Sequence, residues 1–220
     1  MSHSSVSHLA EIVRREAMDW GENVADSYHR PAEQGMNRIW IEVIWPILSR
    51  HKIDLSDTID FACGYGRNAK MLAAAGAAKV TLVDVHPDNI AYCREHLIPL
   101  GNFDVVQNNG YDLADFPSGR FTHLYSFDAM VHFDLEVILA YVREFARVIK
   151  PGGTAFIHHS NYTGNPGGNF RENPGQRNFM SALIFKHASI RGGFDVLEQE
   201  LVNWSCPDSD CVTVLRRRPS

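Results

Sequence analysis

Two carboxylates and two glycines form the chemically most informative pattern in this sequence of 220 residues. Residues 58–68, TIDFACGYGRN, predict a strand that delivers Asp60, a turn built on Gly64 and Gly66, and the start of a helix. Such a turn lets a ligand approach the backbone, and the helix start presents unpaired N–H groups. The next β-branched run ends on Asp84, 20 residues after Gly64, where a carboxylate can meet the ribose of a nucleotide. The pattern predicts a nucleotide-like ligand.

The charge of Asp60 favours a cationic ligand. GYGRNA also satisfies the loose dinucleotide pattern G-x-G-x-x-G/A, but the Asp60 carboxylate would repel a pyrophosphate. S-adenosylmethionine, which carries a sulfonium and an ammonium group, fits an acidic strand end better. The motif D-x-x-C-G-x-G-R-N resembles the first motif of class I S-adenosylmethionine-dependent methyltransferases, and RVIKPGGTAFI resembles that family's helix, turn and strand. The resemblance covers residues 53–217 and implies S-adenosylmethionine as the cofactor.

The resemblance also implies that the N-terminal helices fold over the cofactor as a lid. Tyr28, Met36 and Trp40 are the candidate contacts, although core packing of an amphipathic helix explains Met36 and Trp40 at least as well. The expected lid covers residues 1–52 and the expected cofactor-binding core covers residues 53–217.

Adenine recognition departs from the family pattern. Members commonly carry an acidic residue followed by a glycine after the third strand, whereas this chain has Asn109 there. Recognition would then fall to Gly110 and Tyr111, or to Asp112. The expected cofactor-binding residues are Tyr28, Met36, Trp40, Asp60, Ala62, Gly64, Arg67, Asp84, Val85, Asn109, Gly110, Tyr111, Phe127 and Asp128.

Histidines at the ends of the fourth and fifth predicted strands could act on a substrate, because ligands of open α/β sheets lie outside the carboxyl ends of the strands. Removing a hydroxyl proton needs a base, which accelerates the reaction roughly 10²–10⁴-fold, and a histidine of unperturbed pKa about 6.5 suits this task. His132 is the first candidate, with Asp128 as an orienting partner if the segment is helical; packing or cofactor contact is the alternative role. His159 is the second candidate, as a base or as a hydrogen-bonding partner of the substrate. Asp128, His132 and His159 could together bind a divalent metal, but no metal site is assigned, since scattered histidines and aspartates seldom form one.

The segment 161–178, NYTGNPGGNFRENPGQRN, is predicted to be an irregular loop that leaves the fifth strand beside the methyl donor. A loop of this length in a compact domain is usually functional or disordered, and we expect a substrate lid. Its amides and arginines suit a polyhydroxylated or anionic acceptor. The expected substrate-binding residues are Met130, His159, Asn161, Arg171 and Arg177.

The order of apolar segments predicts the α/β class. The family resemblance implies a seven-stranded, mostly parallel, doubly wound sheet with an antiparallel C-terminal strand. Apolar periodicity predicts helices and β-branched runs predict strands. The predicted helices are 6–20, 32–50 with a kink or an early end at Pro46, 68–77, 87–97, 135–150 and 179–191; the later strands are 79–84, 103–107, 121–127, 154–158, 194–202 and 210–216.

Composition narrows the class of partner. The net charge is −5 and the only basic run is Arg216 to Arg218, so no nucleic-acid partner is expected. No stretch approaches the roughly 18 apolar residues of a membrane span, and no ordinary export signal is recognised. Four cysteines without C-x-x-C spacing indicate reduced thiols in the cytoplasm. We expect a small-molecule substrate, and the sequence gives no oligomeric state.

Four functions follow from these observations. The leading hypothesis is methyl transfer to a hydroxyl of a small polar molecule, such as a sugar or a secondary metabolite. An N-methyltransferase on the same fold would not need the histidines. A nicotinamide-dependent oxidoreductase would use Gly64, Gly66 and Asp84, and a non-catalytic cofactor-binding module would bind S-adenosylmethionine without an acceptor.

Overall fold

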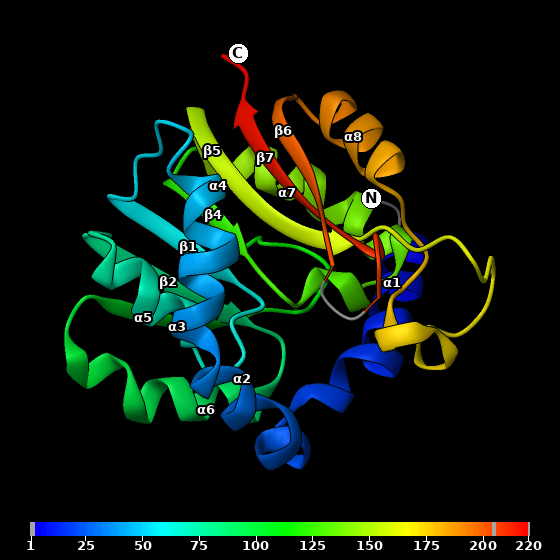
Figure 1. Ribbon diagram of the computed structural model, residues 1–220, viewed down its shortest axis with the longest axis horizontal. Coiled ribbons are helices and arrows are strands. Elements are labelled where there is room, and N and C mark those ends of the chain that lie inside the picture. Colours follow the sequence, from blue (N-terminus) through cyan, green and yellow to red (C-terminus); the bar gives the residue numbers. More distant parts are fainter. Residues whose placement is uncertain (1–2, 204–205, 220) are drawn as a thin grey trace.

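Seven strands form one sheet in the order β3-β2-β1-β4-β5-β7-β6 (Figure 1). The computed structural model describes residues 3–203 and 206–219. β1 to β5 run parallel to one another, and β7 runs antiparallel to both β5 and β6. The predicted α/β class and doubly wound sheet with an antiparallel C-terminal strand are confirmed. The strands are β1 (Asp57–Phe61), β2 (Lys79–Asp84), β3 (Phe103–Gln107), β4 (Phe121–Ser126), β5 (Ile149–Ser160), β6 (Phe194–Val202) and β7 (Asp210–Arg217).

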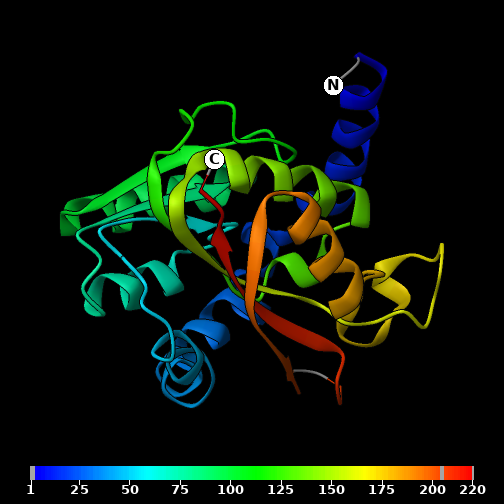
Figure 2. The ribbon, with the colours of Figure 1, turned by 90° about the horizontal axis from the view of Figure 1, so that it is seen from above.

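Helices cover both faces of the sheet. Buried side chains of α1 (His3–Glu16), α7 (Leu135–Val148) and α8 (Ala182–Arg191) pack on one face. Those of α5 (Arg67–Ala74), α6 (Pro87–His96) and the segment 36–48 pack on the other; α7 and this segment lie on opposite sides in Figure 2. The order of strands reverses between β1 and β4, which is where sheets of this kind bind ligands. Within residues 3–203 and 206–219, no helix has the length and apolar character to cross a membrane.

The predicted helix over residues 32–50 is divided into α2 (Arg30–Gln34), α3 (Met36–Ile39), a π turn (Trp40–Ile44) and α4 (Trp45–Leu48). The Trp45 N–H donates to the carbonyl of Trp40, five residues earlier, immediately before Pro46, which has no N–H to continue the ladder. Met36 and Trp40 are buried against α5 and β4 and do not line the cavity described below. The structure therefore favours core packing for Met36 and Trp40, and not the expected contact with the cofactor.

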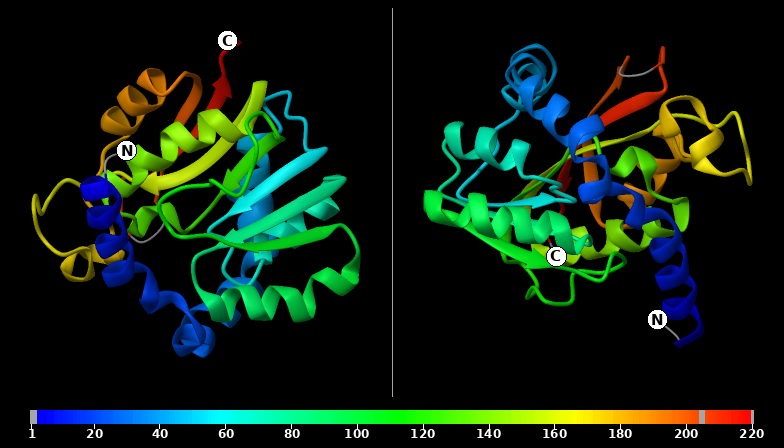
Figure 3. Two further views of the ribbon diagram at one scale, coloured as in Figure 1. Left: turned by 180° about the vertical axis from the view of Figure 1, so that it is seen from behind. Right: turned by 90° about the horizontal axis from the view of Figure 1, so that it is seen from below.

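The expected loop 161–178 contains two short 3₁₀ turns, Phe170–Glu172 and Pro174–Gln176. It lies beside the N-terminal segment, as the opposite views in Figures 1 and 3 show. α1 is followed by a 3₁₀ turn over Ala17–Trp20, so the first predicted helix is a helix and a turn that end at Gly21. α8 begins at Ala182, three residues later than expected.

Candidate active site

A cavity of about 970 Å³, including the space at its open mouth, lies at the carboxyl ends of β1, β2 and β4. Residues of α1 and of the turn that follows it line one side of the cavity. The predicted site residues that line it are Tyr28, Ala62, Gly64, Arg67, Asp84, Val85, Gly110, Phe127, Asp128 and His132.

The turn after β1 has the backbone conformation that its glycines allow. Gly64 and Gly66 have φ of 54° and 72°, and a Cβ on Gly66 would lie 2.5 Å from the Leu97 side chain. The Asp84 carboxylate accepts hydrogen bonds from the Gly64 N–H at 2.9 Å and from the His86 N–H at 2.9 Å. The Asn89 side chain also donates to Oδ1, at 3.2 Å. These bonds fix Asp84 at the cavity wall, and Oδ2 keeps capacity for a further donor.

Asp60 lies beneath the cavity and does not line it. The side chain is 1% exposed, Oδ2 has no hydrogen-bond partner within residues 3–203 and 206–219, and burial raises the pKa of the carboxyl well above its usual range. The expected contact between this carboxylate and a cationic ligand is therefore corrected. The acidic groups at the wall are Glu16, Asp84, Asp128 and Asp134.

Arg67 is the only arginine or lysine among the described residues of the cavity wall. Its Nη2 donates to Oδ2 of Asp128 at 2.8 Å, and the Tyr28 hydroxyl donates to the same oxygen at 2.8 Å. Burial opposes the charged form of Asp128, but the nearby Arg67 and His158 outweigh it and lower the pKa of the carboxyl. Nη1 of Arg67 is buried without a hydrogen-bond partner in the part of the chain that the structure describes. The cavity therefore carries more acidic than basic groups and holds one unsatisfied guanidinium nitrogen.

His132 lines the cavity from the short turn Met130–His132 after β4. Nδ1 lies 2.7 Å from the carbonyl oxygen of Gln176, and the ring stacks on Trp20 at 4.3 Å. A carbonyl only accepts, so Nδ1 carries the proton and Nε2 has the lone pair. Burial lowers the pKa of His132 to about 4, so the ring is neutral at physiological pH.

Two expectations around the histidines are corrected. Asp128 does not orient His132, because its backbone has φ of 61° and no helix connects the two residues; Gln176 provides the contact instead. His159 lies outside the cavity, fully buried, with hydrogen bonds to Ser160 and Thr213. Burial lowers the pKa of His159 to about 3.

The expected substrate-binding residues have structural partners. Arg177 forms a two-pronged ion pair with Asp210, with 2.8 Å for each bond, and Arg171 donates to Asp19 at 2.6 Å. Asn161 bonds the backbone of Asp208 and Ala182. Met130 is fully buried in the apolar core. None of these side chains is in the described cavity wall. The two arginines are therefore not placed to bind an anionic acceptor, which was their expected role.

At the expected adenine position, the structure favours the backbone of one glycine over the neighbouring side chains. Gly110 lines the cavity with φ of 85°, and a Cβ there would lie 2.3 Å from Val13 of α1. Asn109 instead accepts hydrogen bonds from the N–H groups of Tyr111 and Asp112, and neither Asn109 nor Tyr111 is in the described wall.

Sequence reasoning missed the contribution of the first helix and of several polar residues. Apolar spacing predicts that α1 buries one face, but not that this face closes a ligand cavity. Asn108, whose side chain donates to the Tyr141 hydroxyl at 2.8 Å, was passed over for its neighbour Asn109. The cavity residues that were not predicted include Ile12, Val13, Glu16, Ala17, Trp20, His29, Asn89, Asn108, Asp134 and Tyr141.

Residues 59–153, which contain the glycine turn, Asp84 and His132, match the family model described as a methyltransferase domain. Residues 59–153 therefore form a methyltransferase domain of the class I, S-adenosylmethionine-dependent kind. Members of this family use S-adenosylmethionine as the methyl donor. The predicted resemblance of this chain to class I methyltransferases is confirmed.

Solved structures share the fold of this methyltransferase at low sequence identity. One is a chain from the complex of the Haloferax volcanii methyltransferase activator Trm112, with a TM-score of 0.67, 19% identity, and coverage of 86% of this chain and 95% of that one. The PH0226 protein of Pyrococcus horikoshii has a TM-score of 0.67, 18% identity, and coverage of 90% and 95%. An S-adenosylmethionine-dependent methyltransferase of Mesorhizobium loti has a TM-score of 0.64, 17% identity, and coverage of 79% and 97%. No curated protein matches the sequence significantly.

Proposed function

We propose that this methyltransferase methylates a hydroxyl group of a small, neutral, polar molecule such as a sugar or a secondary metabolite. The observation that carries the proposal is the hydrogen bond from Nδ1 of His132, which lines the cavity, to the Gln176 carbonyl. It fixes the tautomer in which Nε2 can take a proton. A methyl acceptor that is a neutral amine would have no need of such a base.

The residues of the cavity fit S-adenosylmethionine. Asp84 would accept hydrogen bonds from ribose hydroxyls, and the unpartnered Nη1 of Arg67 would bind the carboxylate of the methionyl group. The excess of acidic wall groups suits a ligand with a sulfonium and an ammonium group better than one with a pyrophosphate. When bound, this cofactor supplies an electrophilic methyl group on sulfur.

His132 would hold the acceptor hydroxyl and remove its proton at Nε2. Nε2 would take up the hydroxyl proton as the acceptor oxygen is methylated, so the positive charge that the methyl donor loses would end on the His132 imidazolium. Alignment of the two reactants contributes most of the acceleration in such displacements, with effective molarities of about 10⁵–10⁸ M. The stacking of the ring on Trp20 restricts it to one orientation.

The wall beside His132 favours a neutral acceptor. Glu16 lies in this wall, and burial raises the pKa of its carboxyl despite the opposing contact with Arg15. Arg171 and Arg177, which could have held an anion, are bound to Asp19 and Asp210. An acceptor carboxylate or phosphate would meet carboxyl groups here. Arg67, the one arginine or lysine among the described wall residues, pairs with Asp128 and is assigned to the methionyl carboxylate.

The test is methyl transfer from isotopically labelled S-adenosylmethionine to a panel of neutral hydroxylated metabolites and matched amines. The proposal predicts an O-methyl ether as product and loss of at least 100-fold in turnover in His132→Gln, the size of a lost general base. An N-methyl product, or full turnover in His132→Gln, would contradict it. A cytoplasmic location and the division into residues 1–52 and 53–217 stay predictions from the sequence.

A further inference from the structure

Asp210, at the start of β7, is a buried carboxylate that connects the loop 161–178 to residues of the cavity wall. The Asp210 side chain is fully buried and accepts hydrogen bonds from Nε and Nη2 of Arg177, each at 2.8 Å. The Arg177 side chain is only 4% exposed. A two-pronged bond between a planar guanidinium and a carboxylate fixes the orientation of both groups.

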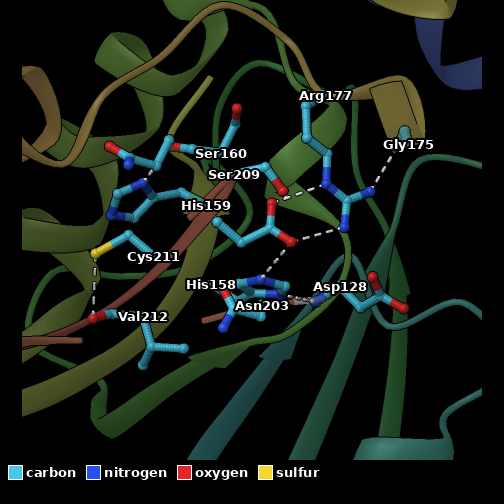
Figure 4. Close-up of polar contacts among 12 residues, drawn as sticks. Asp128, His158, His159, Ser160, Gly175, Arg177, Asn203, Ser209, Cys211 and Val212 are labelled. Carbon is cyan, nitrogen blue, oxygen red and sulfur yellow. Dashed lines mark hydrogen bonds and ion pairs between the residues drawn. The ribbon is translucent and has the colours of Figure 1, made fainter. Parts of the chain in front are cut away.

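Arg177 in turn holds the turn that carries the partner of His132. Its Nη1 donates to the carbonyl of Gly175 at 2.6 Å (Figure 4), and its own carbonyl accepts from the Asn173 side chain at 2.7 Å. Gln176, between Gly175 and Arg177, has φ of 55°, a conformation that a residue other than glycine keeps only when its surroundings impose it. The Gln176 carbonyl then lies 2.7 Å from Nδ1 of His132.

A second arm runs from Asp210 to the other side of the cavity. Nε2 of His158 lies 3.6 Å from Oδ2 of Asp210, and Nδ1 of His158 accepts from the Asp128 N–H at 3.1 Å. His158 and Asp128 lie next to each other in Figure 4, below Arg177. Asp128, like Gln176, has a positive φ, of 61°. Two backbone positions with positive φ, Gln176 and Asp128, are therefore linked to Asp210.

We infer that Asp210 is a positioning residue: through Arg177 and Gln176 it fixes the proton of His132 on Nδ1 and leaves Nε2 as the base, and through His158 it fixes the backbone that carries Asp128. Asp210 does not line the cavity, so it acts through these residues and touches neither cofactor nor substrate. The inference rests on the proposed role of His132 in the methyltransferase.

The test compares the tautomer of His132 in wild type and in the double variant Arg177→Met/Asp210→Asn, by ¹⁵N NMR of the imidazole at pH 7. The double variant removes both charges, so no unpaired ion is left in the interior, and asparagine can still accept from His158. Circular dichroism and S-adenosylhomocysteine binding show that the variant is folded. Asp210→Asn alone is the second variant, which keeps the guanidinium. The matched control is Asp19→Asn/Arg171→Met, which removes the other ion pair of the same loop.

The inference predicts that wild type and control hold one tautomer, with the proton on Nδ1, and that the folded double variant populates both. With an acceptor in hand, kcat of the double variant falls at least tenfold while KM for S-adenosylmethionine changes less than threefold. A wild-type tautomer in the folded double variant overturns the inference. The NMR result needs no acceptor, so it stands apart from the proposed function, which fails instead if His132→Gln keeps full turnover.

Discussion

Nδ1 of His132 donates a hydrogen bond of 2.7 Å to the carbonyl of Gln176, 44 residues later in the chain. This contact joins the turn after β4 to the loop after β5, and it decides which nitrogen of the ring can accept a proton. A loop that was expected to bind substrate with its arginines thus contributes through its backbone.

The first prediction concerns the protonation of His132. Burial lowers its pKa to about 4, so the neutral form persists as the pH falls from 7 to about 5. A ¹⁵N NMR titration should show a midpoint near pH 4. The contribution of His132 to kcat/KM should be lost only as the pH approaches that value. A midpoint near 6.5, the ordinary value for histidine, would show that the ring is solvated and would remove the physical basis of the assignment.

The second prediction is a loss of stability in mild acid. Burial lowers the pKa of His123 and His159 to about 3, as it does that of His132 to about 4. Below about pH 6.5 the unfolded chain binds protons at these histidines and the folded chain does not, so the free energy of unfolding falls, by about 1.4 kcal/mol per histidine and pH unit, until the pH reaches the folded pKa values. The stabilisation is complete above pH 6.5.

Urea unfolding at pH 7.5, 6 and 5 measures this dependence. His159→Gln should reduce the slope by about 1.4 kcal/mol per pH unit, the contribution of one buried histidine. His187→Gln, at an exposed side chain of α8, is the control and should keep the wild-type slope. Equal slopes for wild type and His159→Gln would refute the prediction.

The third prediction distinguishes binding of the amino-acid part of the cofactor from binding of its adenosyl part. Arg67→Lys keeps a positive charge near Asp128 but lacks the second terminal nitrogen. We expect its Kd for S-adenosylhomocysteine to rise about tenfold or more, the effect of one lost hydrogen bond to a charged group. Its Kd for 5′-methylthioadenosine, which lacks the amino-acid carboxylate, should change less than threefold. Calorimetry provides both values, and an equal loss for the two ligands would assign Arg67 to the fold instead of to the carboxylate.

The fourth prediction uses the backbone at Ala62. This residue has φ of 56°, where a side chain costs roughly 1–2 kcal/mol and glycine costs nothing sterically. Glycine also adds about 0.4–1 kcal/mol of unfolded-state entropy, so Ala62→Gly should raise the free energy of unfolding by up to about 1 kcal/mol. Ala75, with φ of −79° at the end of α5, is the matched position, where the same change should be destabilising. Denaturation of both variants tests this, and a destabilised Ala62→Gly would contradict it.

The parts of the site that sequence alone predicted are those with a local cause. Gly64, Gly66 and Gly110 all have positive φ at the ends of strands, and Asp84 ends the strand next to the glycine turn. Their roles follow from backbone geometry and from the topology of a parallel sheet, both of which leave a pattern in a short stretch of residues. The fold was predictable for the same reason.

The roles of the loop residues were not predictable, because their partners are distant in sequence. Arg171 pairs with Asp19, 152 residues away, and Arg177 pairs with Asp210. A sequence shows that an arginine lies in a polar loop, but not which carboxylate it meets. The strand position of His159 also left open which of its faces meets the cavity, and the structure turns that side chain toward Phe185.

The most direct test of the site is calorimetric titration with S-adenosylhomocysteine, with NAD as the competing ligand. The site predicts micromolar binding to wild type, at least tenfold weaker binding to Asp84→Ala because the ribose loses its acceptor, and binding within threefold of wild type for His132→Gln. Binding of NAD but not of S-adenosylhomocysteine by folded protein, or unchanged binding in Asp84→Ala, would contradict the account.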